Sequence, residues 1–162
     1  MAIRGRLPGS CQLVLAILVL VGPLAGVAQA SEPSVGHPGR PRLVPGTPCV
    51  VTARACVDLT ARRAWLITRG RVTGGPVPIN IGGPGEETPV GTFRVWWKDR
   101  NHFSVQQHGT PMPYSVFFKR GVAFHGGSLQ QASAGCVHLR LADAKRFYNT
   151  LRVGDLVQVA RR

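Results

Sequence analysis

The fold class is decided by residues 49–81, which read CVVTARACVDLTARRAWLITRGRVTGGPVPINI. Short runs rich in Val, Ile, Thr and Trp alternate there with short segments rich in Arg, Gly and Pro. β-Branched and aromatic residues favour strands, whereas Gly and Pro favour the turns between them. The stretch therefore predicts strands over 49–60, 64–68 and 77–81, connected as a β-meander.

The same pattern continues toward the C-terminus, with β-favouring runs over 92–97, 116–118 and 122–124 and a last strand over 156–160. Residues 141–151 differ, because their apolar side chains recur at the i, i+3, i+4, i+7 spacing of a helix face. These residues are Ala144, Phe147, Tyr148 and Leu151. The sequence predicts a mainly β fold with one C-terminal helix, in the α+β class.

The first thirty residues have the pattern of a signal peptide. Arg4 and Arg6 precede an apolar run over 13–21, and Ala28-Gln29-Ala30 has the small-x-small form of a cleavage site. We expect cleavage after Ala30 and export of the remaining chain. The alternative is a retained membrane anchor, although a membrane span needs about 20 apolar residues.

Residues 31–48 contain five prolines and three glycines and few side chains that could fill a core. This composition is typical of an extended, mobile linker. A length of 162 residues allows one folded domain, which we place at residues 49–162.

The chain is strongly basic, with 20 Lys or Arg against 7 Asp or Glu and a formal net charge of +13. Such a charge attracts polyanions. For an exported chain, which we expect to be a monomer, anionic cell-wall polymers or lipid head groups are the expected partners. No nucleic-acid-binding motif is present to suggest DNA or RNA. A generally basic surface that only aids solubility is the alternative.

The cysteines of the exported chain divide into an expected structural pair and one expected free thiol. Cys49 and Cys56 enclose a short loop, and export places them in oxidising surroundings, so we expect a disulfide. Two free thiols in the core are the alternative. Cys136 is then left unpaired in an exported chain, which indicates a reactive thiol, unless it is an inert buried one.

The surroundings of Cys136 favour chemistry. It follows Ser133-Ala134-Gly135, where Gly135 allows close backbone approach and frees amides for a developing oxyanion. His125 ends an apolar strand and precedes Gly126-Gly127, whose carbonyl groups could orient the ring. A nearby imidazolium lowers the pKa of a thiol, so the two residues form a candidate nucleophile and base.

Several stretches together resemble the catalytic domain of the L,D-transpeptidases, the YkuD-type peptidoglycan enzymes. Residues 133–139, Ser-Ala-Gly-Cys-Val-His-Leu, resemble the family signature S-H-G-C-[IV]-[RNH]-L, and residues 88–93 resemble its TPxGxF strand. The other matching stretches are Met112–Tyr114, Ala123–Gly126, Asp143–Ala144, Phe147–Tyr148 and Val153–Val159. The resemblance implies a YkuD-like β-sandwich of mixed sheets.

It also implies roles. Cys136 would be the nucleophile and His125 its base and later acid. The Gly126 backbone would orient His125, and the amides of Gly135 and Cys136 would contribute to the oxyanion hole. The thiolate would attack a peptidoglycan tetrapeptide stem, and transfer of the resulting thioester to an amine would form a 3→3 cross-link. Transfer to water would make the protein an L,D-carboxypeptidase.

The resemblance also implies that four further residues lie around the bound substrate. Ser133 would hold the loop or touch the substrate, His138 would contact a carboxylate or amide, and Met112 and Tyr114 would line the pocket wall. Many members have histidine where this chain has Ala134, which cannot donate a hydrogen bond. That difference leaves open a weakly active or inactive relative that only binds peptidoglycan.

Other residues are given no catalytic role. The five histidines lack zinc-ligand spacing, and neither a metal nor another cofactor is expected. Residues 98–113 are polar and turn-rich, so they form either a lid or an ordinary surface connection, with His102 and His108 solvated. Trp65, Trp96 and Trp97 are expected in the core or at its edge, not on a carbohydrate-binding surface.

Overall fold

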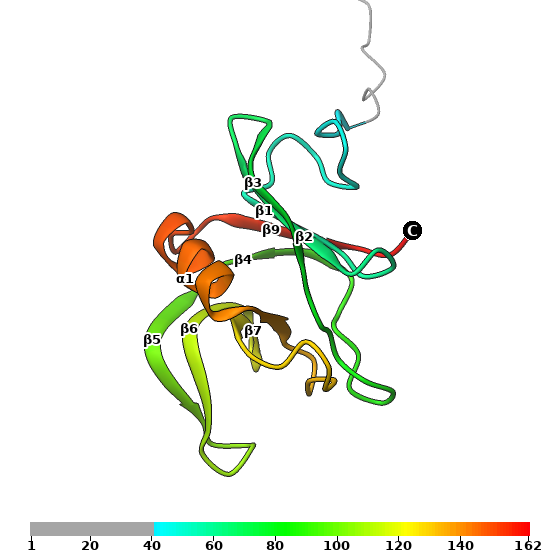
Figure 1. Ribbon diagram of the computed structural model, residues 1–162. Helices are drawn as coiled ribbons and strands as arrows, with labels where there is room; N and C mark the ends of the chain where they lie inside the picture. Colours follow the sequence, from blue (N-terminus) through cyan, green and yellow to red (C-terminus); the bar gives the residue numbers. More distant parts are fainter. Residues whose placement is uncertain (1–40) are drawn as a thin grey trace, which may run out of the picture. The chain divides into compact units, whose positions relative to one another are not determined.

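The structure is a computed structural model that describes residues 41–162 (Figure 1). The predicted signal peptide and residues 31–40 of the predicted linker lie outside the described residues. The described part contains nine strands and one helix. In chain order they are β1 (Ala55–Asp58), β2 (Arg63–Thr68), β3 (Arg71–Pro78), β4 (Gly91–Arg94), β5 (Trp97–Ser104), β6 (Thr110–Lys119), β7 (Val122–Gly126), β8 (Val137–Leu139), α1 (Leu141–Thr150) and β9 (Leu156–Ala160).

The strands form two mixed sheets. The first has the order β3-β2-β1-β9-β4 and the second the order β5-β6-β7-β8. β1, β2 and β3 pair antiparallel as the predicted meander, but β1 covers only 55–58 of the strand predicted over 49–60, and β3 begins at Arg71, before the strand predicted over 77–81. β9 returns to lie parallel to β1 and also pairs with β4. In the second sheet β7 and β8 are parallel. The predicted mainly β fold with one helix and mixed sheets is confirmed.

The main core holds apolar side chains from both sheets and from α1. Alternation along the strands supplies them: Val57 comes from β1, Phe124 from β7 and Val137 from β8, and each is fully buried. Helix α1 packs against β6, β7 and β8. Its buried Phe147 contacts Phe124 of β7, with ring centroids 5.2 Å apart. Figure 1 shows α1 beside β6 and β7. Because one face of β7 and β8 is committed to this core, their alternate residues face the other way, where the candidate site lies.

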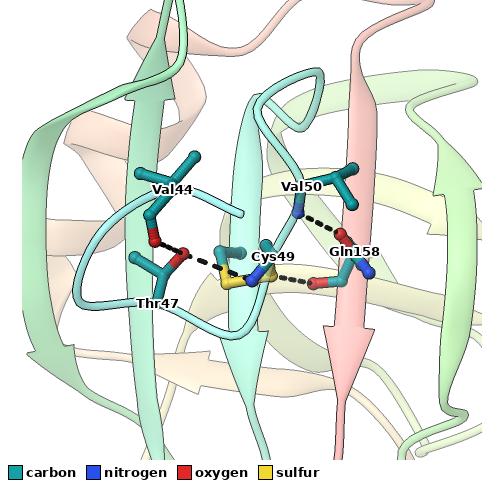
Figure 2. The surroundings of a disulfide bond; sticks show 6 residues. Val44, Thr47, Cys49, Val50 and Gln158 are labelled. Atoms are coloured by element: carbon teal, nitrogen blue, oxygen red, sulfur yellow. Dashed lines mark hydrogen bonds between the residues drawn. A yellow bond between two sulfur atoms is a disulfide. The ribbon is translucent and has the colours of Figure 1, made fainter. Parts of the chain in front are cut away.

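The outer face of the first sheet is covered by residues that the sequence assigned to the linker. Val44 is buried there, and its backbone N–H bonds to the Cys49 carbonyl at 2.8 Å. Figure 2 shows this turn beside β1 and β9, with the Val50 N–H donating to the Gln158 side chain at 2.8 Å. The folded region therefore begins before Cys49, because the turn is needed to cover the outward side chain of Cys56.

The predicted disulfide between Cys49 and Cys56 is present. It lies in a second, smaller apolar cluster together with Val44, Trp65 and Ile67. Thr47 strengthens the turn, since its hydroxyl donates to the Val44 carbonyl and accepts from the Cys49 N–H (Figure 2). The disulfide thus fixes the covering turn to β1 at a sequence separation of 7.

Residues 98–113 are neither an irregular lid nor an ordinary loop. They form most of the hairpin of β5 and β6, which pair antiparallel from Trp97↔Phe117 to Ser104↔Thr110. The polar composition of these residues did not predict strands, because strands that are exposed on one face need few apolar residues. Within residues 41–162 no helix is long and apolar enough to cross a membrane.

Candidate active site

Two adjacent parallel strands bring the predicted nucleophile and base to one face of the second sheet. The register pairs Phe124 with Val137 and His125 with His138. Paired residues share a face and alternate residues share a face, so His125, His138 and Cys136 all lie opposite the core-facing Phe124. The motif spacing thus places Cys136 one strand away from His125.

This face opens on a cavity of about 530 Å³. The hairpin of β5 and β6 forms one wall, the loop before β8 forms another, and His125 lies between them. Its lining residues are Glu86, His102, Ser104, Val105, Gln106, Gln107, Thr110, Met112, Phe117, Gly121, His125, Gln131, Ala132, Ser133, Ala134, Cys136 and His138. No Lys or Arg is among them, although the chain as a whole is strongly basic.

His125 is held as a neutral base. It is 4% exposed, and its Nδ1 lies 3.0 Å from the Gly126 carbonyl oxygen. A carbonyl only accepts hydrogen bonds, so Nδ1 carries the proton and Nε2 has a free lone pair. Burial, followed by the neighbouring His138, lowers the pKa of His125 to about 4. At neutral pH the imidazole is therefore uncharged and able to take a proton.

Cys136 is held as a neutral thiol. It is 7% exposed and packs with Met112, Phe117 and Ala123. Its Sγ donates to the Gly121 carbonyl at 3.6 Å. Burial raises the pKa of the Cys136 thiol, and a hydrogen bond from the Ala123 backbone offsets this only in part.

The sequence-based expectation of an imidazolium beside a thiolate is therefore corrected for this structure. The hydrogen bond of the Cys136 thiol goes to Gly121 and not to His125. Burial opposes both charges, because it raises the pKa of the thiol and lowers the pKa of the imidazole. Nucleophile and base share a cavity as uncharged groups, and a proton transfer must accompany the attack.

The backbone around Cys136 is fixed from two sides. The Ser133 hydroxyl donates to the Cys136 carbonyl at 2.6 Å, which is the loop-holding contact expected of it. The segment 80–83 pairs along the loop, since Ser133 N–H bonds to the Ile81 carbonyl and Gly83 N–H to the Ser133 carbonyl. Gly135 has a φ of 95°, which favours glycine. A strand was predicted as far as Ile81, but no motif indicates that the segment 80–83 supports the loop, because its contribution is backbone hydrogen bonding.

His138 is half-buried and lines the cavity beside His125. Their ring centroids lie 4.8 Å apart with an interplanar angle of 76°. The Nδ1 of His138 donates to the Ser128 carbonyl at 2.9 Å. Gly127 makes room for this ring, since a Cβ there would lie 2.8 Å from it. The contact of His138 with a substrate stays a prediction.

Met112 lines the cavity, but Tyr114 does not. Tyr114 packs against Tyr148 of α1, with ring centroids 5.8 Å apart, and adjoins the main core. Regular alternation predicts one face for residues 112 and 114. However, Tyr114 has a left-handed φ of 58°, which reverses the alternation, so that Met112 and Phe117 face the cavity and Val116 faces the core. Tyr114 therefore does not line this cavity, where the resemblance placed it, and packs toward the core instead.

The hairpin adds a residue that the sequence left in solvent. His102 is half-buried and lines the cavity, and its Nδ1 lies 3.3 Å from Asp99 Oδ2. His108 is exposed in the hairpin turn, as expected. Among residues 41–162, no group of three or more His, Cys, Asp or Glu side chains is arranged to hold a metal ion. The expectation that catalysis needs no metal stays a prediction.

A model of the L,D-transpeptidase catalytic domain, YkuD, matches residues 52–159. The chain belongs to this family. The match includes Cys136, His125 and the strands that present them. No curated protein matches the chain.

Similar solved structures have the same fold. One is an L,D-transpeptidase from Stackebrandtia nassauensis, with 31% identity and a TM-score of 0.62. Another is an L,D-transpeptidase from Mycobacterium tuberculosis H37Rv, with 26% identity and a TM-score of 0.59. The matches cover 65% of this chain and 54% and 56% of those chains, respectively. This L,D-transpeptidase family member therefore spans little more than half the length of the solved relatives.

Proposed function

We propose that this chain is a cysteine L,D-transpeptidase that acts on peptidoglycan tetrapeptide stems through a thioester on Cys136. One observation carries the proposal: His125 on β7 and Cys136, the residue directly before the adjacent parallel strand β8, line the same cavity. Membership of the L,D-transpeptidase family supplies the reaction class.

In the first half-reaction, Cys136 Sγ attacks the carbonyl of the third stem residue while its proton passes to His125 Nε2. The amides of Gly135 and Cys136 stabilise the oxyanion. His125 then gives the proton to the departing terminal D-alanine, which leaves a thioester on Cys136. Charge develops only during the attack, because the resting thiol and imidazole are both neutral.

In the second half-reaction, the side-chain amine of a neighbouring stem attacks the thioester. His125, neutral again, takes the proton of the amine, and collapse of the intermediate returns it to the sulfur. The product is a 3→3 cross-link. Attack by water instead would release a tripeptide, which is the L,D-carboxypeptidase outcome.

We further propose that the protein works outside the cytoplasm, at the cell wall. The N-terminal thirty residues have the signal-peptide pattern, and the Cys49–Cys56 disulfide suits an oxidising compartment. The basic charge would favour anionic wall polymers as additional partners.

The proposal is tested by incubating the protein with tetrapeptide stems and resolving the products by mass. Dimers that are absent from a Cys136→Ala reaction are expected. Tripeptide without dimer would support the carboxypeptidase. Neither product, together with retained binding to purified cell walls, would overturn the enzyme in favour of a peptidoglycan-binding module.

A further inference from the structure

An exposed aromatic cluster lies at the edge of the same sheet face. Trp97 stacks on Phe117, with centroids 4.8 Å apart and an interplanar angle of 21°, and Trp96 lies 5.8 Å from Trp97. Phe117 is buried, but Trp96 is 50% and Trp97 39% exposed. Trp65 lies in the core, as the sequence predicted, whereas the other two tryptophans present large ring faces to solvent.

The cluster is continuous with the catalytic cavity. Phe117 and His102 both line that cavity, and both contact Trp97, the His102 ring edge-on at 5.1 Å. Trp97 pairs with Phe117, and Phe117 pairs with Ala123. The next residue pair, Phe124↔Val137, places Cys136 beside Ala123.

Trp97, Phe117, Ala123 and Cys136 thus form one row across the four strands of the sheet. With neighbouring strands 4.7–4.9 Å apart, this row is about 14 Å long. A stem held at Cys136 by its third residue extends through two residues and a lactyl link to its sugar. At up to 3.6 Å per unit, that link covers about 10–11 Å. When the stem runs along this row, the link ends about 3–4 Å short of Trp97, and the sugar ring itself spans that remaining distance to the tryptophans.

We propose that Trp96 and Trp97 form a saccharide subsite for the N-acetylated sugar that carries the stem peptide. A sugar ring has apolar C–H faces and polar edges, and indole rings offer a matching apolar surface with little conformational entropy to lose. Asp99, two residues beyond Trp97 on the same face, has a half-exposed carboxylate that can accept from sugar hydroxyls. The inference rests on the proposed function and names the part of the substrate beyond the stem.

The subsite predicts a preference for glycan-linked stems. The test compares kcat/KM for a disaccharide-tetrapeptide with kcat/KM for the free tetrapeptide. We expect the ratio to be three- to tenfold in the unchanged protein and to fall toward one in Trp97→Ala. Trp97→Phe should retain part of the preference, because it keeps an aromatic face.

Phe103→Ala is the matched control. Phe103 is 58% exposed on the same strand, but it pairs with Pro111 toward the hairpin turn, whereas Trp97 pairs with the cavity-lining Phe117. This variant should keep the full ratio. If Trp97→Ala does not fold, Trp96→Ala provides the same test with a more exposed side chain.

A second measurement needs no turnover. Titration of Cys136→Ala with the peptide-free disaccharide should change the tryptophan fluorescence, and the Trp96→Ala, Trp97→Ala double variant should abolish the change. A ratio near one in the unchanged protein, or an equal ratio in the tryptophan variants, overturns the subsite and leaves the proposed function standing. Failure to turn over either substrate counts against the proposed function itself.

Discussion

At the scale of single residues, the site is defined by two buried groups whose charged forms are both disfavoured. His125 is suited to accept a proton, and Cys136 keeps its own proton in the resting state. Reactivity toward substrate then depends on proton transfer during the attack. This differs from a cysteine that is activated in advance as a thiolate.

Alkylation of Cys136 by iodoacetamide should show this difference. Because burial raises the pKa of the thiol above its ordinary value of 9.0, the rate should be slow at neutral pH and still increase beyond pH 9. The measurement is the mass of labelled protein against time at each pH, corrected for any label taken up by Cys136→Ala. A rate plateau between about pH 5 and 8 would reveal a thiolate–imidazolium pair and contradict this account.

The buried imidazole should also make stability depend on pH. Its pKa is about 4 in the fold against an ordinary 6.5, so between these values the unfolded chain binds a proton and the folded chain does not. Stability is therefore lost as pH falls below 6.5. Between pH 7 and 4.5 the free energy of unfolding should drop by roughly 2–3 kcal/mol more in the unchanged protein than in His125→Gln. If urea titrations showed the same loss of unfolding free energy in the unchanged protein and in His125→Gln, the burial of a neutral His125 would be contradicted.

The sequence could identify the site residues whose side-chain or backbone chemistry is itself part of a recognisable motif. Cys136, His125 and the orienting carbonyl of Gly126 follow from the motif, and the structure brings them to one place. The orientation of Tyr114 was not predictable, because a left-handed φ at a bulky residue has no sequence signal. The neutral state of His125 and Cys136 was also not predictable, because it depends on burial by residues that are distant in the sequence.

At the scale of elements, the loop before β8 depends on the backbone of segment 80–83. A Cβ at Gly82 would lie 1.9 Å from the Glu86 carbonyl oxygen. Gly82→Ala should therefore displace this segment, lower the free energy of unfolding by about 1–3 kcal/mol, and slow acylation of the protein that stays folded. Denaturant titration and adduct formation measure the two effects.

Gly83→Ala is the matched control for that substitution. Its Cβ would meet only the Ala132 side chain, at 3.2 Å, so a smaller loss is expected. Equal effects at the two positions would contradict the role assigned to the close approach at Gly82.

Elements with alternating or helical apolar patterns were the predictable ones. The helix predicted over 141–151 corresponds to α1, and the strand over 156–160 corresponds to β9. The run predicted over 116–118 lies within β6, but β5 and the outer part of the hairpin were missed, because they are largely exposed and polar. Strand β8 was missed as well, since three residues give too short a pattern.

At the scale of the whole described domain, two apolar clusters share β1. The main core contains Val57, and the smaller cluster contains the Cys49–Cys56 disulfide. Composition suggested a linker up to residue 48, because prolines and glycines mark both linkers and tight covering turns. Only the three-dimensional position of Cys56 shows why that turn must pack.

Removing the disulfide should weaken the domain without altering its chemistry. Closure of so short a loop corresponds to about 2–3 kcal/mol of stabilisation. The double variant Cys49→Ala, Cys56→Ala should lose about this much in denaturant titrations. Its folded fraction should still form an adduct on Cys136. Loss of adduct from a protein that remains folded would contradict the separation of the two clusters.

The central claim is that Cys136 is the nucleophile and that His125 takes its proton. The most direct measurement is intact mass after incubation with a carbapenem, whose strained amide can acylate a thiol. We expect a single acyl adduct on the unchanged protein, none on Cys136→Ala, and a much slower one on His125→Gln. Absence of an adduct on the folded, unchanged protein, or its persistence in Cys136→Ala, would contradict the account.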